Sequence, residues 1–379
     1  MAAPAKKQIL SPVQIGPVTL QHRVVMAPLT RSRAHQPDEV PGDLMREYYA
    51  QRAAEGGLII SEATPISPTA RGWYGAPGIF TVEQIAGWKR ITDVIHAKNG
   101  RIFAQLWHTG RSSHVSMAGT DPVSASVDPS YWNNPENLVS TPHGWAQPSP
   151  HRALWLEEIP GIVRDYRMAA ANAKSAGFDG VEIHAANGYL IDQFLQDGSN
   201  KRTDSYGGSV ANRARLLMEV VEAVSSVWGG DRVAVRIGPS GRWNAMRDSN
   251  PELLFTHVAG ALNQFSLAYL HIIEPRVKGN VVIAEGQAPI AAQQIRKVFY
   301  GKIMAAGGFE PQSAEAAIVA GDADLVAFGR HFISNPDLPR RIAQDLPLSV
   351  YDRDTFYTFD ARGYTDYPAW QALADGVAA

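Results

Sequence analysis

Runs of apolar residues about as long as a β-strand recur eight times along the chain, and a segment with helical spacing follows each of them. Continuous rather than alternating apolarity suits strands that are buried on both faces of a parallel sheet. Eight strand–helix units predict an α/β fold, a (β/α)8 TIM barrel, whose functional side chains lie at the C-terminal ends of the strands. The apolar runs span 24–30, 58–66, 101–108, 178–185, 232–238, 267–274, 302–308 and 325–332. The helical segments span 43–55, 83–97, 157–176, 209–228, 251–264, 289–299, 311–320 and 335–344.

The length and composition of the chain favour one barrel domain over two smaller ones. Its 379 residues are 45% hydrophobic, enough for a large core, and we expect a single domain over 1–379. Short β-like pieces around Gly16-Pro17 predict an N-terminal hairpin that closes the barrel floor. The third strand is separated from its helix by a long stretch without a steady period, 112–155, which we expect to form a lid-like insertion. The aromatic C-terminal tail, 346–379, is expected to fold over the barrel mouth.

Charge and cysteine content narrow the classes of partner. The formal charge is −2, acidic and basic residues are mixed, and no block of like charge occurs, which disfavours nucleic acid and anionic membranes as partners. The chain has no cysteine and therefore no disulfide, thiolate metal site or cysteine nucleophile. The first residues show no secretory leader, and no apolar run could span a bilayer. We expect a cytoplasmic protein that acts on a small molecule.

Glycines end the seventh and eighth predicted strands. Gly307 and Gly308 follow one strand, and Gly329 with Arg330 follows the other. In TIM barrels this position commonly binds phosphate, because bare backbone N–H groups can approach the anion and an arginine can add a charged donor. On this pattern alone, glycines that only make tight turns are an equally good interpretation.

The stretch EIHAANGYLIDQFLQ, 182–196, places three hydrogen-bonding side chains where the fourth apolar run ends. Gly188 indicates that the strand breaks here, and a turn of helix would bring His184 and Asn187 to one side. The two side chains could then donate to one ligand oxygen, and the phenol of Tyr189 could deliver a proton nearby. Each residue also has a structural interpretation: a satisfied histidine, an asparagine that starts the turn, and a packed aromatic ring.

Seven motifs, in this order and spacing, resemble the Old Yellow Enzyme family of flavin-dependent ene-reductases, and the likeness covers almost the whole chain. They are PLTR at 28–31, QLWHTGR at 105–111, EIHAANGYLIDQFL at 182–195, NKRTDSYGG at 200–208, AGGF at 306–309, VAFGRHFISNPDL at 326–338 and GYTDYP at 363–368. The resemblance implies non-covalent FMN, reduction by NADPH or NADH, and oxidation by alkenes conjugated to a carbonyl or nitro group. Nitro compounds and nitrate esters are further candidate substrates.

The resemblance also implies roles for individual residues around FMN. Its phosphate would contact Gly307, Gly308, Gly329 and Arg330. The isoalloxazine wall would be Pro28, Leu29 and Ala63, with Thr30 donating to flavin O4 and Gln105 and Arg236 at the pyrimidine edge. A cation at that edge stabilises reduced flavin, which is anionic there. A salt bridge in the barrel mouth is the alternative role for Arg236.

For the substrate, the resemblance implies that His184 and Asn187 hold the activating oxygen and that Tyr189 protonates the α-carbon. Trp107 and Tyr357 match aromatic residues over the flavin, although core packing explains Trp107 equally well. The sequence leaves the physiological alkene, the choice of NADPH or NADH, and a monomeric or homodimeric state open. Loops 112–150 and 239–250 are expected to set stereochemical preference.

Two other functions compete with this one. A non-catalytic FMN-binding protein is disfavoured by the intact His184, Asn187 and Tyr189. A metal-dependent barrel hydrolase would use His108, His184 and His271, but Glu182 is expected to alternate away from His184, so the ligand geometry is unconvincing. We therefore expect no metal site.

Overall fold

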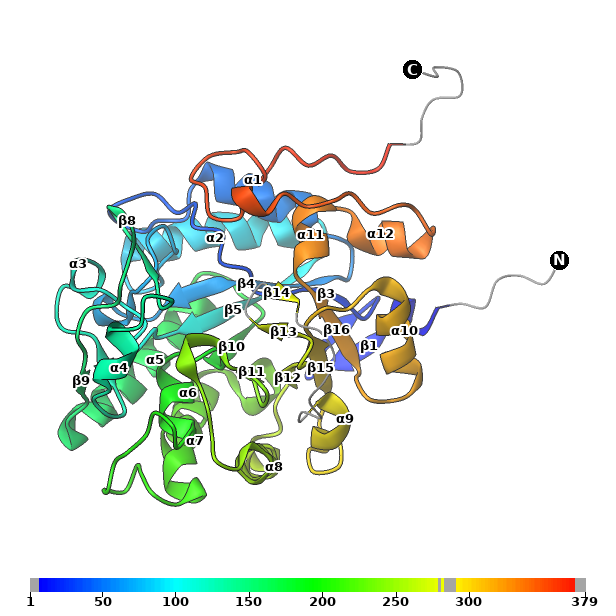
Figure 1. Cartoon of the computed structure of the whole chain (residues 1–379). Coiled ribbons are helices and arrows are strands. Elements are labelled where there is room, and N and C mark those ends of the chain that lie inside the picture. The colour runs from blue at the N-terminus through cyan, green and yellow to red at the C-terminus, as the bar shows by residue number, and fades with distance from the viewer. Residues whose placement is uncertain (1–6, 279–280, 283–290, 372–379) are drawn as a thin grey trace.

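The computed structural model of the chain describes residues 7–278, 281–282 and 291–371. Its centre is a closed barrel of parallel strands that confirms the predicted fold class and all eight predicted strands (Figure 1). In barrel order the strands are β3 (Val24–Met26), β4 (Leu58–Pro65), β5 (Arg101–Trp107), β10 (Gly180–Ala185), β11 (Val233–Ile237), β12 (Tyr269–Ile273), β15 (Ile303–Ala306) and β16 (Leu325–Phe328).

Helices follow the barrel strands in the predicted places. They are α1 (Asp43–Arg52), α2 (Val82–His96), α5 (Ile159–Ser175), α7 (Val210–Trp228), α8 (Pro251–Leu262), α9 (Ala292–Ile295), α10 (Pro311–Val319) and α12 (Leu338–Ala343). The side chain of Ser209 accepts a hydrogen bond from the backbone of Asn212 and caps α7, as its position before the helical segment predicted. The helix predicted over 289–299 is only four residues long, and its first two predicted residues lie outside the described ones.

Two of the short helices that were not predicted follow strands that carry candidate site residues. Helix α6 (Leu190–Leu195) comes after β10, and α11 (Arg330–Ser334) comes directly after β16. Both are too short for a helical period to emerge from the sequence.

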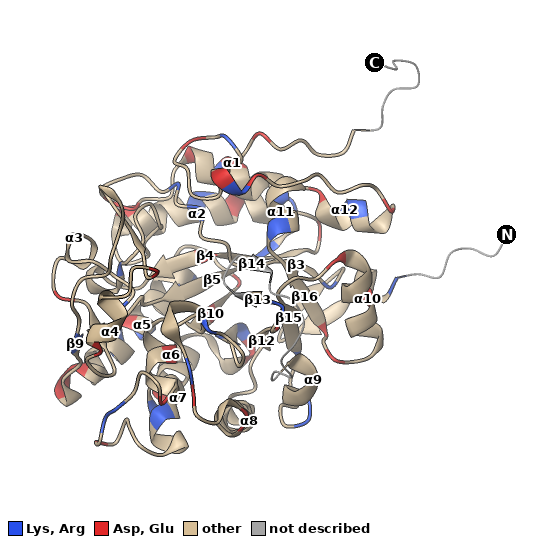
Figure 2. Ribbon diagram, viewed as in Figure 1, with Lys and Arg blue, Asp and Glu red and all other residues tan. Residues whose placement is uncertain are grey.

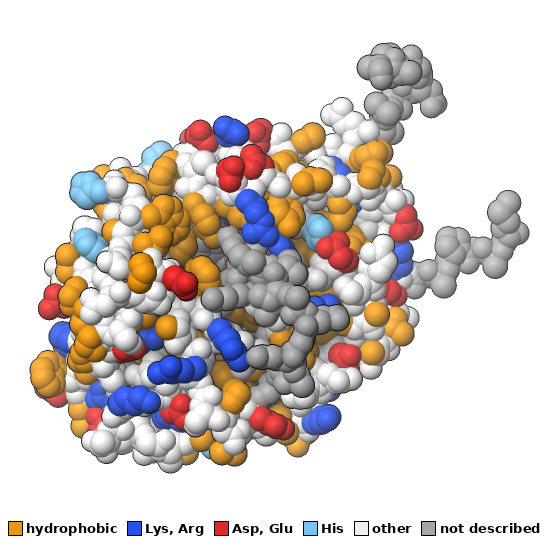
Figure 3. All heavy atoms as spheres, in the orientation of Figure 1, with side chains coloured by type: hydrophobic (Ala, Val, Ile, Leu, Met, Phe, Trp, Pro, Cys, Tyr) orange, Lys and Arg blue, Asp and Glu red, His pale blue; other side chains and the backbone are white. Residues whose placement is uncertain are grey.

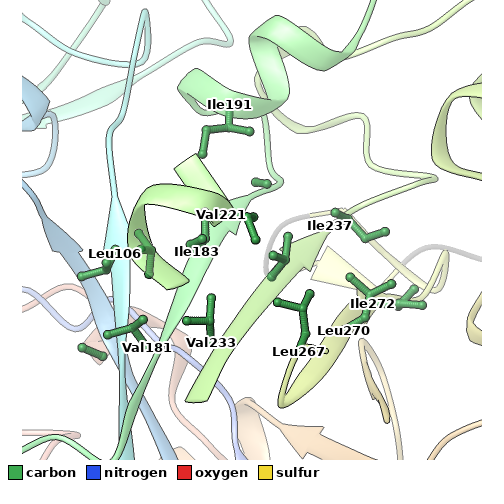
Figure 4. Close-up of a cluster of buried hydrophobic side chains, with 14 of the residues drawn as sticks. Leu106, Val181, Ile183, Ile191, Val221, Val233, Ile237, Leu267, Leu270 and Ile272 are labelled. Atoms are coloured by element: carbon green, nitrogen blue, oxygen red, sulfur yellow. The ribbon is translucent and has the colours of Figure 1, made fainter. Parts of the chain in front are cut away.

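The apolar core lies between the strands and the surrounding helices. On β10, Val181 and Ile183 face outward and pack in one cluster with Val221 of α7 and Ile191 of α6 (Figure 4). Burying an aliphatic side chain of this size stabilises a fold by about 1.5–3 kcal/mol. Because side chains alternate along a strand, Glu182 and His184 face the inside of the barrel.

The predicted N-terminal hairpin closes the barrel floor. Strands β1 (Val13–Ile15) and β2 (Val18–Leu20) pair antiparallel, and their apolar side chains cluster with interior barrel residues such as Phe103. The turn between them holds Gly16 at φ +50°, where a Cβ would lie 1.8 Å from the carbonyl oxygen of Asp231. Only glycine fits this close approach.

The long segment after β5 contains short elements rather than an extended loop. They are α3 (Val115–Ala118), β6 (Val123–Ser124), α4 (Pro129–Trp132), the antiparallel pair β7 (Val139–Thr141) and β8 (Gly144–Ala146), and β9 (Arg152–Ala153). Another short pair, β13 (Val277–Lys278) and β14 (Val281–Val282), follows β12. Elements of two to four residues leave no readable period in a sequence, which is why this stretch was predicted to be irregular.

Acidic and basic residues are interspersed along the chain (Figure 2), and on the face shown in Figure 3 their side chains occur beside apolar ones. Within the described residues, none of the helices has the length and apolarity needed to cross a bilayer.

Candidate active site

A cavity of about 630 Å³ lies at the C-terminal ends of the barrel strands, a size usual for ligand sites. Most of the predicted site residues form its wall, although they come from segments far apart in the sequence. These are Pro28, Leu29, Thr30, Asn187, Tyr189, Arg236, Gly307, Gly308, Gly329, Arg330 and Tyr357.

The other predicted site residues, Ala63, Gln105, Trp107 and His184, are buried next to the wall rather than part of it. Ala63 and Trp107 pack in one apolar cluster with Tyr189. Gln105 is the register partner of Ala63 on the neighbouring strand and is 1% exposed.

The backbone after β10 differs from the predicted helical turn. His184 still belongs to the strand, whereas Asn187 adopts a left-handed conformation with φ +58°, followed by Gly188 with φ +73°. Asparagine tolerates this region better than most residues, and glycine adopts it freely. Asn187 and Tyr189 reach the same cavity through a left-handed turn, and the expectation that a turn of helix aligns His184 with Asn187 was wrong.

Side chains of α6 and of the loop after β11 hold this turn. The backbone N–H of Gly188 donates to Asp192 Oδ2 at 2.8 Å, and its carbonyl accepts from Gln193 Nε2 at 2.7 Å. Asn244 Nδ2 donates to the carbonyl of Asn187 at 2.9 Å. A Cβ at position 188 would lie 2.5 Å from the Cβ of Asn244. None of these supports was predicted, because the sequence does not show which loop packs on the turn.

The imidazole of His184 packs against two aromatic rings that also contact each other. Its centroid lies 5.0 Å from the ring of Tyr189, nearly perpendicular to it, and 6.4 Å from the ring of Trp107. Trp107 also meets Tyr189 edge to face at 4.8 Å. These contacts fix the orientation of His184 and Tyr189, so Trp107 supports the two rings from behind.

The protonation state of His184 follows from burial and one hydrogen bond. Burial, together with the nearby charge of Arg236, lowers the pKa of His184 well below its usual value, so the ring is neutral at neutral pH. The backbone N–H of Ala186 donates to His184 Nδ1 at 3.4 Å. A neutral imidazole that accepts at Nδ1 carries its proton on Nε2. His184 Nε2 is therefore a hydrogen-bond donor.

Tyr189 is protonated in the same environment. Burial raises the pKa of its phenol above the ordinary value of 10, with smaller contributions from Tyr357 and Tyr131. The site thus combines a neutral imidazole donor, a carboxamide and a protonated phenol.

The opposite end of the cavity is shaped for an anion. Gly307 and Gly308 have φ +109° and +67°, backbone conformations that glycine adopts freely and that most other residues adopt only with strain. A Cβ on Gly307 would lie 3.1 Å from the carbonyl oxygen of Glu274. Arg330 lines the same end, and its buried Nη1 has no hydrogen-bond partner among the described residues. An unpaired guanidinium nitrogen beside open backbone fits a negatively charged ligand group.

Arg236 supplies a second cation along the wall. Its Nε is buried and has no hydrogen-bond partner in the described part of the chain. Burial lowers the pKa of Arg236, while the charge of Glu182 opposes that shift. Arg236 and His184 are register partners on β11 and β10, which places the cation beside the neutral imidazole.

Aromatic residues from three segments form the outer wall. Trp73 follows β4, Trp145 lies in β8 and Tyr357 belongs to the tail, and their ring centroids are 5.2–5.9 Å apart. Trp73 and Trp145 were not predicted. Trp73 was detectable in principle, because it lies in the loop after a barrel strand, but nothing in the sequence indicates that β8 approaches the tail.

Two buried arginines hold the tail against the barrel. Arg31 Nη2 donates to the carbonyl of Gly363 at 2.7 Å and its Nε to the carbonyl of Phe356 at 3.1 Å. Arg33 donates to the carbonyls of Phe356 and Thr355 at 2.8 and 2.9 Å. Arg31 follows Thr30 directly and Arg33 lies two residues further on, so the segment that lines the cavity also anchors the tail. The last eight residues of the predicted tail lie outside the described ones.

Comparison with known proteins decides the family. A model of the NADH:flavin oxidoreductase / NADH oxidase family matches residues 8–349. The chain belongs to this family. Among its relatives, putative 12-oxophytodienoate reductase 11 of Oryza sativa subsp. japonica is 47% identical over 369 residues, 95% of this chain and 97% of the relative. The 12-oxophytodienoate reductase 2 of Arabidopsis thaliana is 44% identical over 377 residues, 98% of this chain and 99% of the relative.

Solved structures give the same answer. The old yellow enzyme homologue from Zymomonas mobilis matches with a TM-score of 0.91 and 44% identity, covering 96% of this chain and 100% of that one. Morphinone reductase in complex with tetrahydroNAD matches with a TM-score of 0.88 and 46% identity, covering 97% and 99%. The chain is an NAD(P)H-dependent flavin oxidoreductase of the Old Yellow Enzyme family, as its motifs predicted.

The three histidines of the competing hydrolase, His108, His184 and His271, do not form a metal-ligand group in the described part of the chain. No group of three or more His, Asp or Glu side chains that could hold a metal ion occurs among the residues described. His108 Nδ1 accepts from the backbone of Gly110, and His271 contacts Glu182. One argument made against this hydrolase from the sequence was itself wrong: Glu182 and His184 are two residues apart on β10, so both face the barrel interior.

Proposed function

We propose that the chain is an FMN-dependent ene-reductase that uses NADPH or NADH to reduce alkenes conjugated to a carbonyl or nitro group. The observation that carries this proposal is one cavity lined by Asn187 and Tyr189 together with Arg236, Arg330 and strand-end glycines. Two relatives are by name reductases of 12-oxophytodienoate and of morphinone, and the morphinone reductase structure contains tetrahydroNAD. These names favour an organic acceptor and a nicotinamide donor.

The cavity residues fit FMN without covalent attachment. The phosphate would bind at Gly307, Gly308, Gly329 and Arg330, where Arg330 Nη1 has no hydrogen-bond partner among the described residues. The ring system would lie against Pro28, Leu29 and Thr30, which line the wall. Arg236 would meet the edge that becomes negative on reduction. When bound, FMN supplies two-electron hydride chemistry between the nicotinamide donor and the alkene.

The role of His184 and Asn187 in this proposal is to hold the activating oxygen of the substrate. The proton on His184 Nε2 and the amide N–H of Asn187 can donate to that oxygen, which gains negative charge as the β-carbon accepts hydride. A neutral imidazole suits this task, because it polarises the oxygen without transferring its proton. Removing one preorganised donor of this kind costs about 2.7–4 kcal/mol in a transition state.

The role of Tyr189 is to deliver a proton to the α-carbon. Its phenol lies in the cavity wall and stays protonated because burial raises its pKa. Hydride at one carbon and a proton at the other add two hydrogens to the double bond. The rings of Trp107 and His184 hold the phenol in place for that transfer.

A colour test decides between this proposal and a protein that only binds flavin. The purified protein should be yellow, bleach when NADPH is added anaerobically, and recover its colour when 2-cyclohexenone follows. Nitroalkenes and nitrate esters tested in the same way would define the range of acceptors. A yellow protein that NADPH does not bleach would contradict catalysis, and a protein that takes up no FMN would contradict the proposal entirely.

A further inference from the structure

A buried polar layer lies beneath the cavity, and Glu182 is its acidic member. Glu182 lies two residues before His184 on β10, so its side chain points into the barrel one layer below the imidazole. It is 0% exposed. Below it, the barrel interior is filled by the apolar cluster of the floor, which includes Phe103 and Met304. An acidic side chain in such a position is costly unless it is paired and hydrogen-bonded. Its presence calls for a function that apolar packing cannot supply.

Inside the barrel, Glu182 connects the neighbouring strand β5 on one side with β12, two strands away, on the other. Its Oε1 accepts from Gln105 Nε2 of β5 at 2.7 Å, and its Oε2 lies 2.9 Å from His271 Nδ1 of β12. Strand β11 separates β10 from β12, and the β11 residue in register with Glu182 is Ala234. The small side chain of Ala234 leaves room for the carboxylate to cross to His271.

The contact with Gln105 fixes the orientation of its carboxamide. A carboxylate accepts hydrogen bonds and cannot donate them, so only the NH₂ end of Gln105 can face Glu182. The amide oxygen must then point elsewhere. Gln105 is the register partner of Ala63, which packs with Trp107 and Tyr189 behind the cavity wall. The carboxylate thereby determines which polar atoms Gln105 presents to that side of the barrel.

The charge of Glu182 also acts on Arg236. Burial opposes ionisation of Glu182, but His271, Arg236 and Gln105 together hold its pKa below the usual value, so it is anionic. Burial lowers the pKa of His271 despite the pull of Glu182, so this ring is neutral. Arg236 is in register with His271 on one side and His184 on the other. Among Glu182, His184, Arg236 and His271, Arg236 is the only cation, and Glu182 is its countercharge.

We propose that Glu182 is a positioning residue for the flavin: it orients Gln105 and partly offsets the charge that Arg236 presents to the pyrimidine edge. This inference rests on the proposed FMN site. The offset makes reduction of the flavin less favourable than Arg236 alone would make it, so the carboxylate sets the midpoint potential without touching the substrate.

The test compares three variants of the FMN-loaded protein. Glu182→Gln keeps the shape of the side chain and removes its charge. Glu182→Asp keeps the charge, but its shorter side chain moves the carboxylate away from Gln105. Asp324→Asn is a matched control. Asp324 accepts from the backbone of Ile303 and pairs with Lys302 at the other end of the barrel. The measurements are the dissociation constants of oxidised and reduced FMN and the two-electron midpoint potential, with circular dichroism to check folding.

In Glu182→Gln, the preference for reduced over oxidised FMN should be at least about tenfold stronger than in the parent protein. This corresponds to a midpoint potential at least about 30 mV more positive. Glu182→Asp should keep the parent potential but bind oxidised FMN several-fold more weakly, and Asp324→Asn should change neither value. A folded Glu182→Gln that loses FMN while the control retains it also supports positioning. An unchanged potential and affinity in both Glu182 variants would overturn the inference. A parent protein that takes up no FMN would instead overturn the proposed function.

Discussion

His184 and Tyr189 meet edge to face, with ring centroids 5.0 Å apart and an interplanar angle of 81°. His184 lies near the C-terminal end of β10, and Tyr189 is the residue before α6. The left-handed turn at Asn187 and Gly188 makes this meeting possible. Two groups with different chemical roles, a neutral donor and a protonated phenol, are thereby fixed relative to each other.

Tyr189→Phe should separate the two half-reactions. A positioned general acid contributes about 10²–10⁴-fold to a rate, so alkene reduction should slow by at least about 10²-fold. Reduction of the flavin by NADPH needs no proton from the phenol and should change little. Anaerobic stopped-flow spectroscopy measures each half-reaction separately, and equal slowing of both would contradict proton donation by Tyr189.

The oxidative half-reaction should be insensitive to pH around neutrality. Burial and the charge of Arg236 hold the pKa of His184 well below its ordinary value of 6.5, so the ring is already neutral at neutral pH. The raised pKa of Tyr189 keeps the phenol protonated through the same range. The reoxidation rate by 2-cyclohexenone should stay level from about pH 6 to about pH 9. A decline centred near 6.5 as pH rises would indicate a protonated histidine instead.

Arg330→Ala should weaken FMN binding. Losing a charged donor to an anionic group costs about 1.5–3 kcal/mol, a decrease in affinity of about 10- to 150-fold. The flavin content after dialysis, measured by absorbance, should therefore decrease. Lys89→Ala is a matched control, because Lys89 is an exposed cation on α2 whose ion pair is with Asp93 in the same helix. Full flavin retention by Arg330→Ala would remove the phosphate assignment.

Arg33→Ala should loosen the tail. Arg33 donates to the carbonyls of Thr355, Phe356 and Asp360, and each such bond contributes about 0.5–1.5 kcal/mol. The free energy of unfolding in urea should decrease by about 2–4 kcal/mol, and amide exchange across 355–363 should accelerate. Arg46→Ala removes a half-exposed arginine from α1 and should change neither quantity much. Unchanged exchange in Arg33→Ala would show that the tail is held by other contacts.

The barrel could be predicted because its signal is local and repeated. Each buried strand is a continuous apolar run, and the residues that follow these runs necessarily gather at one end of the barrel. Thr30, Arg236 and Arg330 could therefore be assigned to a common site without knowing how the chain folds between them. The motif resemblance then supplied the chemistry that strand ends alone left open.

The parts that could not be predicted depend on backbone dihedral angles and on contacts between distant segments. Asparagine can adopt the φ of +58° found at Asn187, but it can equally adopt a helical φ. The sequence therefore did not exclude a helical turn. The supports from Asn244, Trp145 and Arg33 come from segments whose paths no pattern specifies. The position of Glu182 is different: its spacing from His184 already placed both residues on one face, and simple alternation would have predicted this correctly.

The central claim is that His184 and Asn187 hold the substrate over the flavin, and the double variant His184→Ala/Asn187→Ala tests it most directly. The measurement is the anaerobic rate at which 2-cyclohexenone reoxidises the NADPH-reduced protein. We expect an intact flavin spectrum and a rate lower by at least about 10²-fold, the usual cost of losing one such donor. A reoxidation rate equal to that of the parent protein would contradict the claim.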